Sequence, residues 1–305
     1  MSEGKERAQA RLENLSAIEP LISSLRVLSL STMQMAMNRQ GSLDEYARRF
    51  NEVAQLVRRI ANRKAAVPAP EQPSDYRPKQ YYKILAVIGS TRGIVGHYNK
   101  NLANLTKAHL DANLGESIRV LVFGQRIQPL LRQAGVAFTP LGSLSSGSLP
   151  DYDVAAKLIR EWNQALQEGN LKKVSILAYR RMGSNTDYQR VLTELLPGKK
   201  DSLVEKQEQE KEEGKEPWPV PIIEGDPGLI FEKIEGHIIA IQFYRLILDS
   251  VAAENLFRFR LLEEAKENTS NLLEEISLEV QANRRKEITQ QLQELLAGSG
   301  LLAQR

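Results

Sequence analysis

Residues 87–102, VIGSTRGIVGHYNKNL, decide the fold of the central part of the chain. The apolar run YYKILAV leads into them and is typical of a buried strand. The chain then turns through Gly89, Gly93 and Gly96 and enters a helical pattern that begins near Asn99. A strand, a glycine loop and a helix in this order predict a βαβ unit, the arrangement in which many proteins bind a phosphate.

This glycine loop lacks the pattern of a nucleotide-binding loop. Its spacing, Gly89-x3-Gly93-x2-Gly96, matches neither GxGxxG nor a loop that ends in Gly-Lys-Ser/Thr. The nearest acidic residue that could hold a ribose is Asp111, which lies inside the predicted helix. Glycines after a strand also serve tight turns and close helix–strand packing. We therefore predict a loop that binds no nucleotide, with Arg92 as a surface contact.

Strands and helices alternate further along the chain. Strands are predicted at 81–89, 117–124 and 172–182, and helices at 99–114, 125–135 and 152–169. Residues 141–150, rich in glycine and serine, are predicted to form a loop, and the segment 189–197 follows the last of these strands. This alternation predicts a small Rossmann-like α/β domain with a mostly parallel sheet.

Both ends of the chain carry long helical patterns. From residue 8 to 66, and again from 227 to 296, apolar side chains recur at steps of three and four residues. Helices of roughly 55 and 70 residues would be about 80 Å and 105 Å long. Neither helix can bury its apolar stripe against itself. The simplest arrangement is an antiparallel coiled coil formed by the N- and C-terminal helices.

Three positions leave an alternative open. Pro20 removes a backbone donor and clashes with the preceding turn, so it predicts a kink or a helix that restarts there. Gly41 is a second weak point, and Asn268 is a third. Breaks at these positions would give a bundle of shorter helices in place of the coiled coil.

These patterns divide the chain into five segments. The order is an N-terminal coiled-coil helix, a proline-rich linker, the α/β domain, a charged linker and a C-terminal coiled-coil helix. The predicted bounds are 1–66, 67–78, 79–197, 198–226 and 227–305.

The composition excludes several classes of function. The 41 basic and 38 acidic residues leave a net charge of +3, too even a balance to indicate a nucleic-acid partner. With no cysteine and three scattered histidines, neither a disulfide framework nor a zinc site is expected. No run approaches the ~18–20 apolar residues of a membrane span, and the charged first residues indicate no secretory signal.

No group of side chains has the pattern of an active site. Glu161 with Asp151 or Asp153 could pair as carboxylates, but no nucleophile, base or metal cluster accompanies them. The methionines at 33, 35 and 37 are spaced by two, so they cannot share one helix face. We predict no catalytic residue, no cofactor and no metal site in this chain.

The last helix contains the most specific motif. Residues 281–302, QANRRKEITQQLQELLAGSGLL, resemble the closing motif of the gamma subunit of F-type ATP synthases, with Asn283, Arg284, Ile288 and Thr289 at matching positions. Upstream, SVAAENLFRFRLLEEAKENTSNL (250–272) is similar to a second segment of that family. Its matching residues are Ser250, Glu254, Arg258 and Asn268.

The rest of the chain also resembles this family, with some departures. The glycine loop matches at Ser90, Arg92, Gly93, Gly96, Tyr98 and Asn99, and residues 11–39 align with the first helix of the family. Thr91 replaces the aspartate of the family's loop, and His97 replaces its second paired glycine. Where the family's first helix is rich in lysine, residues 20–31 read PLISSLRVLSLS and contain one basic residue, Arg26.

The resemblance implies a non-catalytic central-stalk subunit. Such a subunit couples ion-driven rotation of a membrane ring to conformational change at the nucleotide sites of an alpha/beta hexamer, and so serves ATP synthesis and ion transport. The implied partners are the alpha, beta and epsilon subunits and the c-subunit ring. The implied location is peripheral, on the cytoplasmic side of an energy-coupling membrane (bacterial inner or thylakoid). On this resemblance we expect partner contacts at Arg26, Met33, Arg92, Glu254, Arg258, Asn283, Arg284, Arg285, Ile288 and Thr289.

The departures keep a second function open. In place of lysines, the first helix carries the hydroxyl residues Ser23, Ser24, Ser29, Ser31 and Thr32. We hypothesise that such a shaft couples less tightly or serves a different set of ATPase subunits. The alternative is a gamma-derived scaffold or regulatory binding protein that does not rotate. The basic run at 284–286 fits a solvated helix face and a contact with an acidic partner loop equally well.

Overall fold

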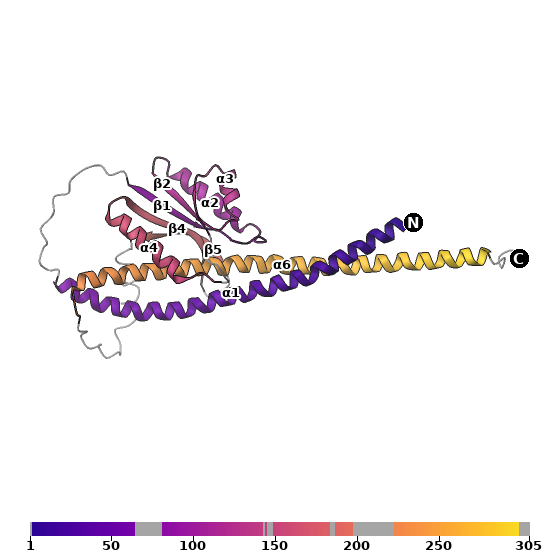
Figure 1. Ribbon diagram of the computed structural model, residues 1–305, viewed down its shortest axis with the longest axis horizontal. Helices are drawn as coiled ribbons and strands as arrows, with labels where there is room; N and C mark the ends of the chain where they lie inside the picture. The colour runs from indigo at the N-terminus through magenta and orange to yellow at the C-terminus, as the bar shows by residue number, and fades with distance from the viewer. Residues whose placement is uncertain are drawn as a thin grey trace. The chain divides into compact units, whose positions relative to one another are not determined.

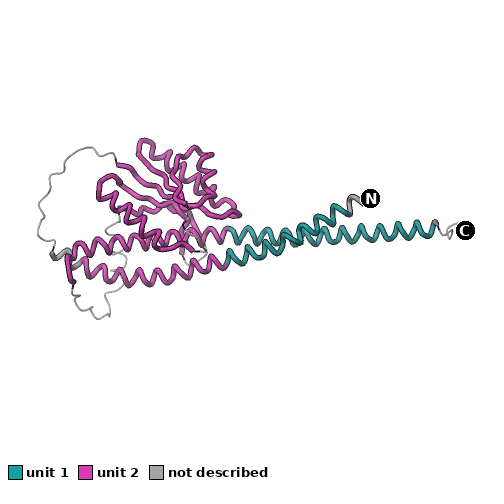
Figure 2. The backbone as a smooth tube through the Cα atoms, viewed as in Figure 1, with its two compact units in different colours: residues 1–30, 258–305 teal, residues 31–257 magenta. Residues whose placement is uncertain are grey.

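The computed structural model describes most of the chain and divides it into two compact units (Figures 1 and 2). The described residues are 2–64, 81–142, 144, 149–183, 187–197 and 223–298. One unit comprises residues 1–30 with 258–305, and the other comprises residues 31–257. The predicted linker 67–78, and the predicted linker 198–226 as far as residue 222, lie outside the described residues.

The larger unit is built on a five-stranded sheet in the order β3-β2-β1-β4-β5. The strands are β1 (Tyr82–Ile88), β2 (Ile118–Phe123), β3 (Thr139–Gly142), β4 (Leu171–Arg181) and β5 (Tyr188–Leu196). The first four run parallel, and β5 pairs antiparallel with β4. The predicted parallel-rich α/β domain is confirmed. The predicted loop 141–150 is wrong at its start, because residues 141 and 142 belong to the edge strand β3.

Helices cover both faces of this sheet. They are α2 (Tyr98–Ala112), α3 (Gln128–Gln133) and α4 (Tyr152–Gln167). On one face, Ile84 and Ile176 share a core with Ile159 and Trp162 of α4. Side chains alternate along a strand, so Tyr179 belongs to the other face, and its ring stacks on Tyr98 of α2 at a centroid distance of 4.4 Å. The sheet is therefore a middle layer.

The terminal helices are continuous. They are α1 (Ser2–Lys64) and α6 (Pro227–Gly298). The restart predicted at Pro20 is wrong, and so is the alternative of a bundle broken at Gly41 and Asn268. Pro20 and Gly41 are both exposed, and no neighbouring atom lies within 4 Å of the place where a Cβ would stand on Gly41. Their costs of about 3 and 1 kcal/mol do not end a helix that gains packing along its whole length.

The two helices run antiparallel, as predicted. In the larger unit Gln40 of α1 contacts Asp249, Asp44 contacts Arg245, and Tyr46 contacts His237. The residue numbers rise along α1 as those of their partners on α6 fall, which is the pattern of antiparallel helices. In the smaller unit Arg26 pairs with Glu263 across the same two helices.

The middle of α6 is mostly buried. Over residues 240–256 most side chains are buried, including Phe243, Tyr244 and Ile247 at 0–1% exposure, and Arg245 is the one exposed side chain in this stretch. A helix stretch that buries most of its side chains belongs inside a core. Here that core includes the sheet and α4, with Leu43 of α1 packed against it.

A buried carboxylate links α1 to α6 inside this unit. Asp249 is 3% exposed, and its Oδ1 accepts a hydrogen bond of 2.7 Å from Nε2 of Gln40. Burial raises the pKa of Asp249 above its ordinary value, although the hydrogen bond from Gln40 and the charge of Arg245 pull it down. The charged form is therefore disfavoured in the folded chain.

Two glycines let the carboxyl ends of β1 and β2 meet. Gly124 has a φ of +86°, and a Cβ built on it would lie 2.4 Å from the carbonyl oxygen of Gly89. A Cβ on Gly89 would lie 2.4 Å from Cγ2 of Ile127. Any larger residue would separate the glycine loop from the turn after β2.

The close approach at Gly124 predicts a large stability loss. Gly124→Ala combines an unfavourable positive φ with a backbone clash, and we expect it to lower the free energy of unfolding by about 3 kcal/mol or more. Gly115→Ala is the matched control, since Gly115 has a φ of +100° but no atom lies within 4 Å of the place where its Cβ would stand. It should lose only about 1 kcal/mol. Urea denaturation measures both, and equal losses would contradict the packing argument.

The burial of Asp249 predicts a pH-dependent effect of Asp249→Asn. Because the folded pKa is raised above the ordinary 3.8, this group contributes stability below that pH and loses it as pH rises through the folded pKa. Asparagine has no such charge. The variant should therefore match the parent near pH 4 and gain on it by on the order of 1 kcal/mol at pH 7. Urea denaturation at the two pH values tests this, and a gain confined to low pH would refute it.

Candidate functional site

The glycine loop is held by its own side chains. The amide of Ser90 donates to Oδ1 of Asn99 at 2.9 Å, and Nδ2 of Asn99 donates back to Oγ of Ser90 at 2.8 Å. The Ser90 hydroxyl donates to the carbonyl of Arg92 at 2.9 Å. Ser90 is 0% exposed and Asn99 is 5% exposed. The loop therefore has a fixed shape before any partner arrives.

A carboxylate from α6 occupies the amides of this loop. The backbone N–H groups of Thr91 and Arg92 each donate to a carboxylate oxygen of Glu254, at 3.3 Å. Adjacent amides at the carboxyl end of a strand are the donors that a phosphate would use. In this chain they bind an anion that belongs to the chain itself. The arrangement is that of a joint between the loop and α6.

Tyr98 completes the joint. Its hydroxyl lies 3.3 Å from the carbonyl oxygen of Ser250 and 3.4 Å from that of Ile88, and the side chain is fully buried. Its ring stacks on Tyr179 and meets Phe257 edge-on at 5.7 Å. One residue at the start of α2 therefore contacts the sheet and α6 together.

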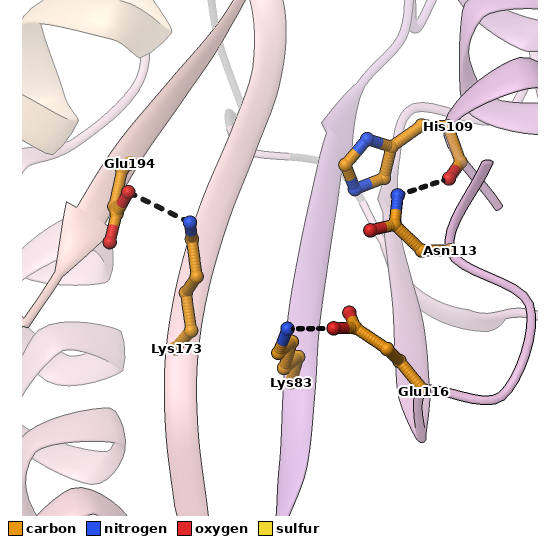
Figure 3. A network of polar contacts seen from close by, with 6 residues as sticks. All are labelled: Lys83, His109, Asn113, Glu116, Lys173 and Glu194. Atoms are coloured by element: carbon orange, nitrogen blue, oxygen red, sulfur yellow. Dashed lines mark hydrogen bonds and ion pairs between the residues drawn. The ribbon is translucent and has the colours of Figure 1, made fainter.

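Ion pairs lie near the amino ends of strands β1 and β4, at the end of the sheet away from the glycine loop (Figure 3). Lys83 pairs with Glu116 at 2.5 Å, and Lys173 pairs with Glu194 at 2.8 Å. The hydrogen bond from Lys83 lowers the pKa of Glu116, while burial, followed by the charge of Lys173, lowers the pKa of His109. Partly exposed pairs of this kind stabilise a fold by at most about 1 kcal/mol.

A histidine bridges three helices beside a cavity. Nε2 of His237 lies 2.9 Å from the hydroxyl of Tyr46, and Nδ1 lies 2.8 Å from that of Tyr152. Burial lowers the pKa of His237, and burial with the nearby Tyr46 raises the pKa of Tyr152 to about 12. The adjoining cavity, about 770 Å³, is lined by apolar and polar side chains, among them Ile159 and Asn163. Sequence reasoning missed this bridge, because its three residues are far apart in the chain.

Groups that could hold a metal ion are absent from the part of the chain that the structure describes. The carboxylates considered for catalysis do not form a site either. Asp151, Asp153 and Glu161 are all exposed, at the start and along the outer side of α4.

The structure places the predicted contact residues in two kinds of environment. Four are buried or engaged within the chain. Met33 is 8% exposed, Arg258 is 6% exposed, and Glu254 binds the glycine loop. Arg26 is partly buried, with its guanidinium 2.5 Å from Glu263 and over the ring of Phe259 at 5.9 Å.

The remaining predicted contacts face outward. Arg92, Arg284, Arg285, Ile288 and Thr289 are exposed, and Asn283 is partly exposed. Five of these six lie within one stretch of α6, where the Thr289 hydroxyl donates to the carbonyl of Arg285 at 2.9 Å. This stretch therefore offers charged and apolar side chains together.

The hydroxyl residues of α1 do not all point outward. Ser29 is 3% exposed, and its hydroxyl donates to the carbonyl of Leu25 at 2.8 Å. The exposed Ser24 donates in the same way to the carbonyl of Pro20, at 2.8 Å. The hydroxyl hydrogens of both residues bond the helix itself, which leaves Ser24 only its acceptor lone pairs for a partner.

The smaller unit exposes many large apolar side chains. They are Ile18, Leu21, Leu25, Val27 and Leu28 on α1, and Leu272, Leu278, Ile288, Leu292, Leu295 and Leu296 on α6. A monomeric soluble protein rarely exposes so much apolar surface, and such surfaces are typical of protein–protein contacts. Among the helices that the structure describes, none is both long and apolar enough to cross a membrane.

Comparisons with known proteins match the whole chain. The family model described as ATP synthase matches residues 5–302. The ATP synthase gamma chain of Granulibacter bethesdensis is 23% identical over 298 residues, which cover 96% of this chain and 98% of that one.

Two solved structures share the fold. One is a chain of the Euglena gracilis mitochondrial ATP synthase in its OSCP/F1/c-ring structure, with a TM-score of 0.62 and 11% identity over 99% of this chain and 95% of that chain. The other belongs to the rotor structure of the same enzyme, with a TM-score of 0.60 and 11% identity, covering 94% of this chain and 100% of that chain. From the fold and the family match together, this chain belongs to the ATP synthase family and is a diverged member of its gamma chains.

Proposed function

We propose that this chain is the rotating central-stalk subunit of an F-type ATP synthase. The observation that carries the proposal is the pair of very long antiparallel helices, which expose apolar and cationic side chains over residues 258–298 of α6. Its partners would be the alpha and beta subunits around these helices, with the epsilon subunit and the c-subunit ring at the α/β domain. The chain would lie peripherally on the cytoplasmic side of an energy-coupling membrane.

The mechanism requires an asymmetric shaft. At each angle a beta subunit would meet a different face of the helix pair, and each face would favour a different conformation of that subunit. A conformational equilibrium shifts only by as much as the two states differ in affinity for the shaft. The nucleotide sites would lie in the alpha and beta subunits, and this chain would do no chemistry itself.

The candidate contacts divide between two tasks in this proposal. The outward group at Arg284, Arg285, Ile288 and Thr289, with Asn283 beside it, would touch the surrounding subunits. Arg92 would be a surface contact of the α/β domain. Arg26 and Glu254 would act inside the stalk, since both bind groups of this chain. Met33 and Arg258 would serve packing, because both are buried.

The alternative is a gamma-derived scaffold that does not rotate. The lysine-poor stretch at 20–31 favours it, because a shaft turning in a protein sleeve gains from charged, exchangeable contacts. The residues that match the closing motif of the family at 281–298 oppose it. Two of their side chains are exposed arginines on the apolar surface that a sleeve would cover.

Affinity capture separates these functions. We expect the tagged chain, recovered from native membranes, to bring alpha and beta subunits in a three-to-three-to-one ratio with itself, as measured by quantitative mass spectrometry. A truncated chain that ends at residue 280 is the control and should recover less of both. Recovery of one unrelated partner without alpha and beta would overturn the rotor proposal in favour of the scaffold.

The lysine-poor stretch of α1 predicts that adding positive charge there strengthens the coupling of rotation to ATP hydrolysis. In a reconstituted complex, Ser23→Lys with Ser24→Lys should raise the number of ions pumped per ATP by about twofold, the scale of one or two exposed ion pairs. Ser42→Lys is the control, because Ser42 is exposed on the same helix but belongs to the other unit. Unchanged or lower coupling in the double variant would count against the hypothesis.

A further inference from the structure

The α/β domain has few ways to hold α6 against turning. The covalent connections run through residues 65–80 and 198–222, outside the described part of the chain. Within the described part, α6 packs in an apolar core that includes Phe243 and Ile247. Apolar burial is non-directional, so it resists separation better than it resists sliding of one surface over another.

In the described part of the chain, directional bonds reach α6 in two regions, one near its start and one around residues 249–254, where the backbone of Arg181 also bonds Asp249. Near the start of α6, His237 bonds Tyr152 at 2.8 Å, and the Tyr244 hydroxyl donates to the carbonyl of Pro150 at 2.9 Å. Farther along, Glu254 accepts the two loop amides, and Ser250 accepts from Tyr98. All of these contacts lie within the larger unit.

The two regions lie on different faces of the helix. His237 and Glu254 are 17 residues apart. At ~1.5 Å and ~100° per residue, that separation is about 25 Å along the axis and about 100° around it. A rotation of the domain about α6 would break both sets of bonds, because it moves the domain's bonding groups sideways away from their partners on the helix. Each set of bonds lies off the helix axis, so each opposes rotation about it, and the two together also oppose tilting of the domain along the helix.

We propose that Glu254 is the positioning residue that fixes the α/β domain to α6 against rotation about the helix axis. The inference rests on the proposed rotor function, in which torque enters at the α/β domain and leaves along the helices. Glu254 binds backbone amides, so this contact depends on where the loop lies and not on the side chains of Thr91 and Arg92. Removing the carboxylate would let the loop move relative to α6 while the apolar core stays buried.

The first experiment measures the hydrogen bonds between Glu254 and the loop amides in the full-length isolated chain. Hydrogen exchange of the Thr91 and Arg92 amides should accelerate about fivefold or more in Glu254→Ala, and by less in Glu254→Gln, which retains one acceptor oxygen. Glu264→Ala is the matched control, an exposed glutamate ten residues along the same helix. Equal exchange in the parent chain and in both Glu254 variants would overturn the proposal.

The second experiment measures coupling in the complex reconstituted with alpha, beta, epsilon and the membrane sector. Glu254→Ala should leave ATP hydrolysis within about twofold of the parent and lower ions pumped per ATP several-fold. Because the chain has no cysteine, Thr91→Cys with Glu254→Cys forms a unique pair. When a short bis-methanethiosulfonate links the two cysteines before assembly, this variant should regain coupling. Reduction, which releases the linker, should abolish coupling again. If Glu254 only stabilised the fold, coupling would not rise on linking and fall on reduction.

The outcomes distinguish the inference from the function on which it rests. Faster amide exchange with unchanged coupling in Glu254→Ala, or no recovery on linking, would overturn the positioning role and leave the rotor function standing. Failure of the parent chain to assemble with alpha and beta would refute the rotor function and the positioning role with it. Loss of coupling that the linker reverses would support both.

Discussion

The burial of most of α6 over residues 240–256 is the constraint on which the larger unit depends. A helix stretch that buries most of its side chains cannot lie on a surface, so it needs neighbours on several sides. The sheet and α4 bury it, and α1 packs beside it at Leu43. Once these layers close, the few polar groups between them must pair. Gln40 meets the buried Asp249 there, and one helical turn away Arg245 pairs with Asp44 at the surface. Apolar burial holds the sheet and the helices together, and the polar contacts fix how α1 is aligned along α6.

The same helix changes character after residue 257. From Arg260 to Ala297 most side chains are at least partly exposed, and large apolar residues are among them. Two helices that cover only one stripe of each other leave the rest of their apolar surface to another molecule. One continuous helix is therefore a core element in one unit and exposes much apolar surface in the other, where we propose that partners bind. Membership in a family of stalk subunits is consistent with that division.

Much of the fold could be predicted from the sequence, and the misses have physical causes. The strand-and-helix alternation and both long helices follow from periodicity, which depends only on local spacing. The edge strand β3 was missed because its four residues, TPLG, contain a proline and a glycine that are typical of loops. The break predicted at Pro20 failed because a local cost was outweighed by packing along the helix. The His237 bridge and the Gln40–Asp249 contact could not be predicted, since each joins residues about 85 to 210 positions apart.

The glycine loop shows how the same local geometry can serve opposite purposes. Exposed amides after a strand attract an anion, and the sequence pattern alone cannot say which one. Here Glu254 supplies it from within the chain. A group held in place by the fold competes as though it were present at millimolar concentration or higher, so a free phosphate of similar intrinsic affinity gains little access. A residue that the family resemblance marks as a partner contact thus turns inward. It converts what would be a ligand-binding loop into the joint that attaches the sheet to its helix.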